Sequence, residues 1–170
     1  MTTLFTIGYE GSEISLFIDQ LLEKGVRVLA DVRALPLSRK PGFSKTRLSA
    51  HVEEVGIRYH HFPELGDPKE GRQAARAGNH TEFRRIYISH LLGRHQQLAL
   101  NELARIAAND ATSMMCFERE PRLCHRSIIA ERMRECGLTV HDIFPIQLVR
   151  DERRAALQPR RYLGEGTAPA

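Results

Sequence analysis

Residues 116–126 read CFEREPRLCHR, and they connect a largely apolar run, 112–116, that predicts a strand to a run, 127–136, that predicts a helix. Two thiols, a carboxylate, an imidazole and several guanidinium groups therefore share one strand-to-helix loop. In an open α/β sheet, ligands bind where strands end and helices begin. The stretch predicts a ligand site, but by itself it does not identify a reaction.

The rest of the chain repeats this alternation of strand and helix patterns. Strands are predicted at 4–9, 26–32, 57–62, 113–117 and 139–144. Helices are predicted at 12–25, 44–56 and 124–136, and as two helices within 81–108 that part near Gly93. Between them, residues 64–79 form a polar, glycine-rich loop, a length typical of lids and mobile segments.

This alternation predicts the α/β class, with one Rossmann-like domain over 1–149 and a mainly parallel five-stranded sheet that carries helices on both faces. A strand order of 3-2-1-4-5 would bring the first and fourth strands together at a switch point. That order would gather five chemistry-bearing residues along one edge of the sheet: Gly8, Asp31, Arg33, Cys116 and Glu118.

Composition narrows the class of protein. The 170 residues are 27% charged and 42% hydrophobic, which is typical of a globular domain. No apolar run approaches the roughly 20 residues of a membrane-spanning helix, and no signal peptide is recognisable, so we expect a cytoplasmic protein with no membrane partner. The three cysteines are then expected to be free thiols. A net charge of +4 permits an anionic partner, and residues 150–170 are expected to form a basic, flexible tail.

Cys124 is the candidate reactive thiol. It lies at a predicted helix start beside His125 and Arg126, and both the helix dipole and nearby cations lower the pKa of a thiol. His125 could serve as an acid or base. The alternatives are a buried thiol that only packs and a histidine that only braces the loop. The same helical spacing predicts that Arg132 faces inward, with Glu118 or Asp31 as its partner.

Other polar groups lie at predicted strand ends. Glu118 could act as a general base or could hold an arginine, and Asp31 and Arg33 point the same way on their strand. The basic loop that follows, 38–47, contains Arg39 and is typical of an anion site, although a solvated loop is the alternative. Gly8 and Tyr9 form a turn at which the backbone could approach a ligand.

No metal site is predicted. Cys116, Cys124 and His125 could supply zinc ligands, with His60 or His61 as a fourth, but zinc motifs usually place paired cysteines two to four residues apart. Here seven residues separate the two cysteines. No cofactor-binding motif is recognisable either, because neither a Walker loop nor a dinucleotide fingerprint occurs.

Several segments together resemble a known bacterial family, domain of unknown function 488. They are Thr6 to Tyr9, Asp31 to Arg33 with Pro36 and Ser38-Arg39, Gly56 to Tyr59, Glu64 to Gly66, and Cys116 to Glu118 through Pro121 to Cys124-His125-Arg126. The resemblance spans about residues 4 to 145. It implies a Rossmann-like α/β domain and no established reaction. The family usually has histidine where this chain has Tyr9.

The sequence supports three hypotheses. In the first, an enzyme acts on a small phosphorylated or nucleotide-like ligand, and loss of Arg33 or Arg126 weakens binding without lowering the melting temperature. Its expected catalytic residues are Glu118, Cys124 and His125. Its expected ligand-binding residues are Gly8, Tyr9, Asp31, Arg33, Arg39, Cys116 and Arg126. The alternatives are a nucleic-acid-binding protein that uses the basic loop and tail, and a ligand sensor without catalysis.

Overall fold

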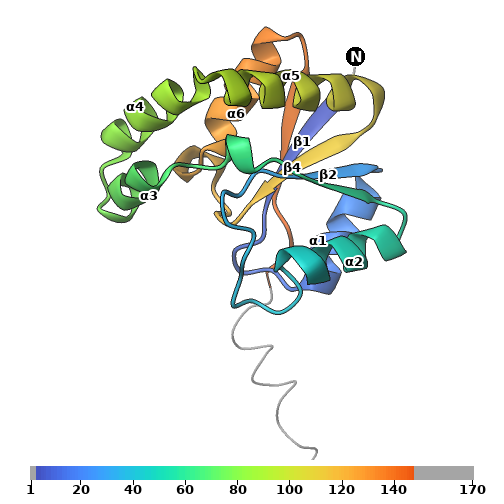
Figure 1. Cartoon of the computed structure of the whole chain (residues 1–170). Coiled ribbons are helices and arrows are strands. Elements are labelled where there is room, and N and C mark those ends of the chain that lie inside the picture. The colour runs from blue at the N-terminus through green and yellow to red at the C-terminus, as the bar shows by residue number, and fades with distance from the viewer. Residues whose placement is uncertain (1–2, 148–170) are drawn as a thin grey trace, which may run out of the picture.

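The computed structural model describes residues 3–147, and their five strands form one sheet in which every neighbouring pair is parallel (Figure 1). The strands are β1 (Thr3–Gly8), β2 (Val28–Asp31), β3 (Arg58–His61), β4 (Thr112–Cys116) and β5 (Thr139–Ile143). The α/β class and the five-stranded parallel sheet of a Rossmann-like domain are therefore confirmed. The predicted strand boundaries agree with the structure to within two residues.

The order of the strands is β3-β2-β4-β1-β5, so the predicted order 3-2-1-4-5 is wrong. The fourth strand inserts between β1 and β2, and β5 pairs with the other edge of β1. Both β1 and β4 are apolar enough for the centre of a sheet, so their sequences do not distinguish the two orders. The two strands are neighbours in either order, and Gly8 therefore still lies opposite Cys116.

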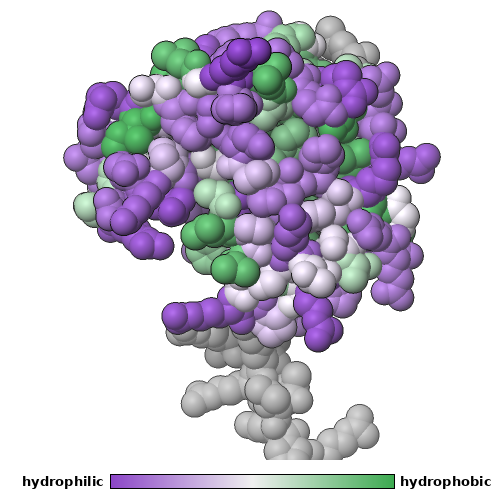
Figure 2. Space-filling model, viewed as in Figure 1, coloured by the Kyte–Doolittle hydropathy of each residue, from purple (hydrophilic) through white to green (hydrophobic). Residues whose placement is uncertain are grey.

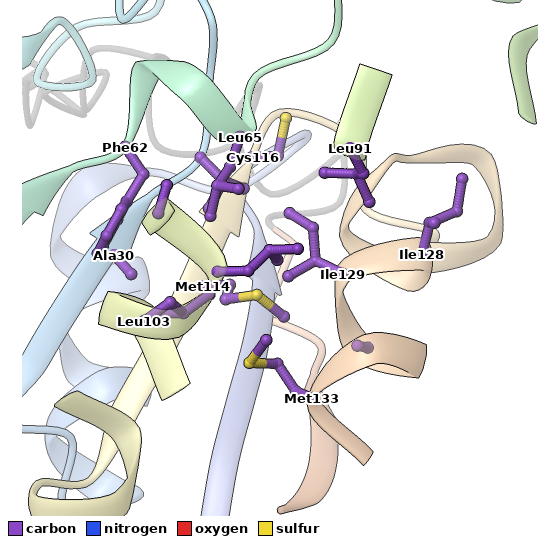
Figure 3. Packing of buried hydrophobic residues seen from close by; sticks show 14 of the residues in the cluster. Ala30, Phe62, Leu65, Leu91, Leu103, Met114, Cys116, Ile128, Ile129 and Met133 are labelled. Atoms are coloured by element: carbon purple, nitrogen blue, oxygen red, sulfur yellow. The ribbon is translucent and has the colours of Figure 1, made fainter. Parts of the chain in front are cut away.

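Two helical layers cover the sheet (Figure 1). On one face, α1 (Ile14–Glu23) and α2 (Lys45–Glu54) bury Phe17, Leu21, Leu48 and Val52. The other face carries α4 (His80–Leu91), α5 (Arg94–Asn109) and α6 (Arg126–Glu135). Figure 3 shows how Met114 of β4 meets Leu103, Ile129 and Met133 from this second layer. Cys116 lies at the end of β4 in the same cluster, so its thiol group is held in place by the packed core.

The polar segment 64–79 is not the open loop that its composition predicts. It contains a short 3₁₀ turn, η1 (Pro63–Leu65), and a helix, α3 (Lys69–Arg76). The helix sequence KEGRQAAR has no long apolar stripe, but Gly71 is buried and Ala74 and Ala75 pack against the core cluster. Tertiary packing against small side chains stabilises a helix that propensity alone does not predict.

The predicted basic tail lies outside the described residues. Within residues 3–147, none of the helices has the length and apolarity needed to cross a bilayer.

Candidate functional site

A cavity of about 400 Å³ opens where β1, β2 and β4 end, and we name it the strand-end cavity. Five residues predicted for the site line it: Tyr9, Arg33, Arg39, Cys116 and Glu118. The sequence analysis missed three further polar residues in its wall: Asp67, Arg72 and Arg76. These belong to the segment 64–79 interpreted as a loop, whose polar composition gave no sign that it folds back over the strand ends. The predicted grouping at one sheet edge is therefore observed, while the roles of the residues remain predictions.

Cys116, Cys124 and His125 form a compact group that we call the thiol cluster. One sulfur or nitrogen atom from each residue lies within 4.8 Å of the others, and all three side chains are buried. Cys124 Sγ lies 3.7 Å from His125 Nδ1. On the other side of the ring, His125 Nε2 donates a hydrogen bond of 2.7 Å to the Val32 carbonyl oxygen. This bond fixes the ring so that Nδ1 faces the sulfur atoms.

Cys124 and His125, which lie in contact within the thiol cluster, shift each other's pKa. Burial opposes ionisation of Cys124, but the hydrogen bond from Cys116 and the positive charges of His125 and Arg126 lower the pKa of the Cys124 thiol well below its usual value. Burial also opposes protonation of His125. The charge and hydrogen bond of Cys124 outweigh it, and the pKa of His125 rises to about 9. The pair therefore favours a thiolate beside an imidazolium.

The Cys124 thiolate also raises the pKa of two neighbouring groups, Cys116 and Glu118. The hydrogen bond to Cys124 and burial raise the pKa of the Cys116 thiol well above its usual value. Burial, followed by the negative charge of Cys124, raises the pKa of Glu118 to about 7. One oxygen of the Glu118 carboxyl group, Oε2, is buried without a hydrogen-bond partner in the described residues.

Arg126 is fully buried directly behind the wall of the strand-end cavity. Its Nη2 donates to the Glu118 backbone oxygen at 2.5 Å, and its Nη1 lies 3.5 Å from Thr6 Oγ1. Its Nε has no partner in the described part of the chain, and none of the ion pairs there includes this arginine. Arginine stays charged in proteins. The site therefore contains a buried positive charge that no carboxylate neutralises directly.

The prediction that Arg132 is the inward arginine of this helix is wrong. Arg132 is partly exposed and pairs with Glu135 at 3.0 Å. The buried positions 126, 129, 130 and 133 follow the i, i+3, i+4, i+7 spacing, and position 132 lies off that stripe.

Asp31 and Arg33 form a second buried group, which we call the aspartate network. Arg33 donates from Nε and Nη2 to the two Asp31 oxygens at 2.8 and 2.7 Å, and from Nη1 to the Phe43 carbonyl oxygen at 2.8 Å. Tyr59, which the sequence analysis did not select, donates its hydroxyl to Asp31 at 2.5 Å. Burial works against the charged guanidinium, but the hydrogen bonds and charge of Asp31 raise the pKa of Arg33 further. Most donors of Arg33 are thus already occupied within the protein.

Gly8 and Tyr9 make close contacts with other residues of the protein. A Cβ atom at Gly8 would overlap the Glu118 carbonyl group, so glycine is needed for the close approach of the 116–118 segment. Tyr9 stacks on Phe43 with ring centroids 4.3 Å apart, and its hydroxyl accepts a hydrogen bond from Arg33 at 3.2 Å. The backbone therefore approaches Glu118 at this turn.

The basic loop lies between two cavities. Arg39 lines both the strand-end cavity and a neighbouring cavity of about 480 Å³, which Arg47 and His51 also line. Ser44 lies at the N-cap of α2, but its hydroxyl bonds to Ser38 and not to the helix. A larger cavity, of about 630 Å³, lies at the β3 edge among Arg58, Glu102 and Arg105 and contains none of the thiols. Of these three cavities, the strand-end cavity is the one that a residue of the thiol cluster, Cys116, lines.

The two strand histidines are separate from the thiol cluster. His60 is exposed, as expected for one member of an alternating pair, and its ring stacks on Phe62. His61 Nε2 donates to the Arg33 carbonyl oxygen at 2.8 Å. The imidazole at the thiol cluster is therefore that of His125.

Comparison with known proteins gives one positive result. No curated protein and no solved structure matches the chain. The family described as Domain of unknown function DUF488 matches residues 13–133, which is more than half of the sequence and includes Arg33, Cys116, Glu118, Cys124 and Arg126. The chain therefore belongs to the DUF488 family.

Proposed function

We propose that the protein is an enzyme that binds a small phosphorylated or nucleotide-like ligand in the strand-end cavity. The observation that carries this proposal is an excess of positive charge beside reactive groups. Arg33 is neutralised by Asp31, and Arg72 lies 3.8 Å from Asp67. Arg39 and Arg76 also line the cavity, and neither has an acidic partner within 4.0 Å among residues 3–147. Guanidinium groups of this kind bind phosphate oxygens in pairs.

The wall of the cavity also has an apolar part. Leu35, Leu37 and Phe117 line it with exposed fractions of 63%, 74% and 46%. Figure 2 shows a surface that is mainly hydrophilic on the side viewed, with hydrophobic residues in small separate groups. Exposed apolar side chains next to arginines favour a ligand that has both an anionic group and a flat or apolar group. A nucleotide has both.

Glu118 is the proposed catalytic residue. Glu118 lines the cavity, and burial together with the charge of Cys124 raises the pKa of its carboxyl group to about 7, so this group can exchange a proton with a bound ligand. Cys124 and His125 do not line the cavity and lie one layer behind Cys116 and Glu118. In this proposal they position and polarise the wall, and they do not themselves contact the ligand.

Calorimetry with pyrophosphate and with adenosine 5′-phosphates tests the binding step. We expect Arg39→Ala and Arg76→Ala each to weaken binding by about tenfold, equal to about 1.4 kcal/mol. Arg94→Ala is the matched control, because Arg94 is exposed on α5 and lines none of the cavities described above. Equal affinity in all variants would contradict the assignment of this cavity.

Turnover is tested with the same panel by mass spectrometry of the products. Glu118→Gln is expected to lower the rate by roughly 10²–10⁴-fold while leaving binding nearly unchanged. A wild-type protein that binds but never turns over any member of the panel would instead be a sensor.

The nucleic-acid alternative depends on the basic loop and on arginines that lie outside the described residues. It requires affinity for oligonucleotides to fall steeply with salt, since each neutralised phosphate releases counterions. Binding of mononucleotides with only a shallow salt dependence would favour the cavity.

A further inference from the structure

The thiol cluster has the arrangement of a metal site. Its three buried donor atoms are two sulfurs and one ring nitrogen, all within 4.8 Å of one another. Zinc binds sulfur at about 2.3 Å and nitrogen at about 2.0 Å in tetrahedral geometry. Those bond lengths place neighbouring sulfur and nitrogen ligands roughly 3.5 Å apart. The observed 3.7 Å between Cys124 Sγ and His125 Nδ1 is close to that spacing.

The outer contact of His125 is a second, independent observation. Histidine ligands of metals almost always donate their other ring N–H to a carboxylate, a backbone carbonyl or water, which fixes the tautomer. His125 Nε2 donates to the Val32 carbonyl oxygen at 2.7 Å, so displacement of the Nδ1 proton by a metal ion would leave the lone pair on the atom that faces Cys124. The ring is therefore already held in the orientation that a ligand needs.

The buried groups around the cluster also suit a cation. Two thiolates would neutralise the charge of one divalent ion within the protein interior. Glu118 is not part of the group of donor atoms that lie within 4.8 Å of one another among the described residues, so the three residues leave a fourth position open to a small exogenous ligand.

We infer that Cys116, Cys124 and His125 bind one divalent metal ion that accepts sulfur and nitrogen ligands, zinc in the first instance, with the fourth position open to a small exogenous ligand. The long sequence separation of the cysteines does not prevent this, because β4 and the start of α6 bring them together. The inference goes beyond the proposed function and does not require the cavity to bind an anion.

The test uses the untagged full-length protein, reduced and freed of metal under anaerobic conditions, and titrated with Co²⁺ and then Zn²⁺. We expect one Co²⁺ per chain, with the visible bands of a tetrahedral site and a thiolate charge-transfer band, all displaced by Zn²⁺. Cys116→Ser and Cys124→Ser should each lower the affinity by more than the 10- to 100-fold that loss of an outer-shell partner costs. Cys136→Ser is the matched control, because Cys136 is exposed and outside the cluster.

X-ray absorption at the zinc edge is measured on the wild-type protein, so the result does not depend on whether a variant folds. We expect two sulfur neighbours at about 2.3 Å together with nitrogen or oxygen neighbours. A zinc environment without sulfur, or a Co²⁺ spectrum that Cys136→Ser abolishes and Cys116→Ser leaves unchanged, would overturn the inference. Anion binding by calorimetry is measured on the same samples, so failure of the metal site and failure of the proposed function are separate results.

Discussion

The aspartate network contains one buried arginine, Arg33, and a second buried arginine, Arg126, lies next to the thiol cluster, and the surroundings of the two differ. Arg33 contacts both oxygens of Asp31 and one backbone carbonyl, and Asp31 also accepts the Tyr59 hydroxyl. Arg126 is more deeply buried, but it contacts a backbone oxygen and a distant hydroxyl, and its Nε has no partner in the described chain. A satisfied buried ion pair is costly to break, because removal of one partner leaves the other charge buried and unpaired, whereas an unsatisfied buried charge is a group that the fold retains at a cost.

The same substitution at the two arginines gives the sharpest form of this comparison, and the larger effect is expected at Arg33. Arg33→Met would leave Asp31 buried without its charged partner. Breaking a buried pair in this way costs about 3–5 kcal/mol of unfolding free energy. Chemical denaturation monitored by circular dichroism measures it. From the structure we thus expect the opposite of the sequence-based prediction that loss of Arg33 leaves the melting temperature unchanged.

An exposed ion pair provides the control for Arg33→Met. Arg58 pairs with Asp110, but its side chain is 66% exposed. Arg58→Met should therefore change the unfolding free energy by about 1 kcal/mol or less. If Arg33→Met had an effect no larger than this control, the aspartate network would not be a stabilising unit.

These expectations also show what sequence can and cannot predict here. Alternating patterns predicted the five strands, because apolar strand runs and helical stripes are local properties. The order of β1 and β4 was not predictable, since it depends on which of two similar strands receives both neighbours. Helix α3 was missed because its buried face consists of glycine and alanine.

In the candidate site, too, the sequence predicted some features and not others. Cys124, His125 and Arg126 were selected because a helix start next to a strand end is visible in the sequence. The sequence did not show that most hydrogen-bond donors of Arg33 are occupied within the protein. The Phe43 carbonyl oxygen and the Tyr9 hydroxyl that it contacts come from other parts of the chain. Likewise, whether Arg126 or Arg132 faces inward depends on where the helix packs, and the fully buried arginine proved to be the first residue of α6.

A smaller effect is expected at Tyr59, the third member of the aspartate network. Tyr59→Phe removes one hydrogen bond to Asp31 but keeps the ring and both contacts from Arg33. We expect a loss of about 1–2 kcal/mol in unfolding free energy, because hydrogen bonds to charged groups are stronger than neutral ones. Urea denaturation of wild type and variant in parallel measures it. A variant as unstable as Arg33→Met would mean that Tyr59, and not the ion pair, organises the network.

The smallest change in stability is expected at Arg126, although it is the more deeply buried arginine. Arg126→Met removes a charge that no carboxylate neutralises directly, and the Cys124 thiol keeps His125 as its charged partner. Replacing a buried ion by an apolar side chain of similar length is often neutral or stabilising, so we expect the unfolding free energy to change by about 1 kcal/mol or less, in either direction. The same denaturation series measures this, with Arg33→Met as the matched substitution.

The function of the site should respond to Arg126→Met where stability does not. Arg126 holds the Glu118 backbone and lies beside the Cys124 thiol, so its loss should weaken pyrophosphate binding in the strand-end cavity. Weaker binding in a protein of unchanged stability would show that the unneutralised charge is kept for a ligand. If Arg126→Met instead lost as much stability as Arg33→Met and bound pyrophosphate normally, both arginines would be structural, and the difference between the two regions would have no functional meaning.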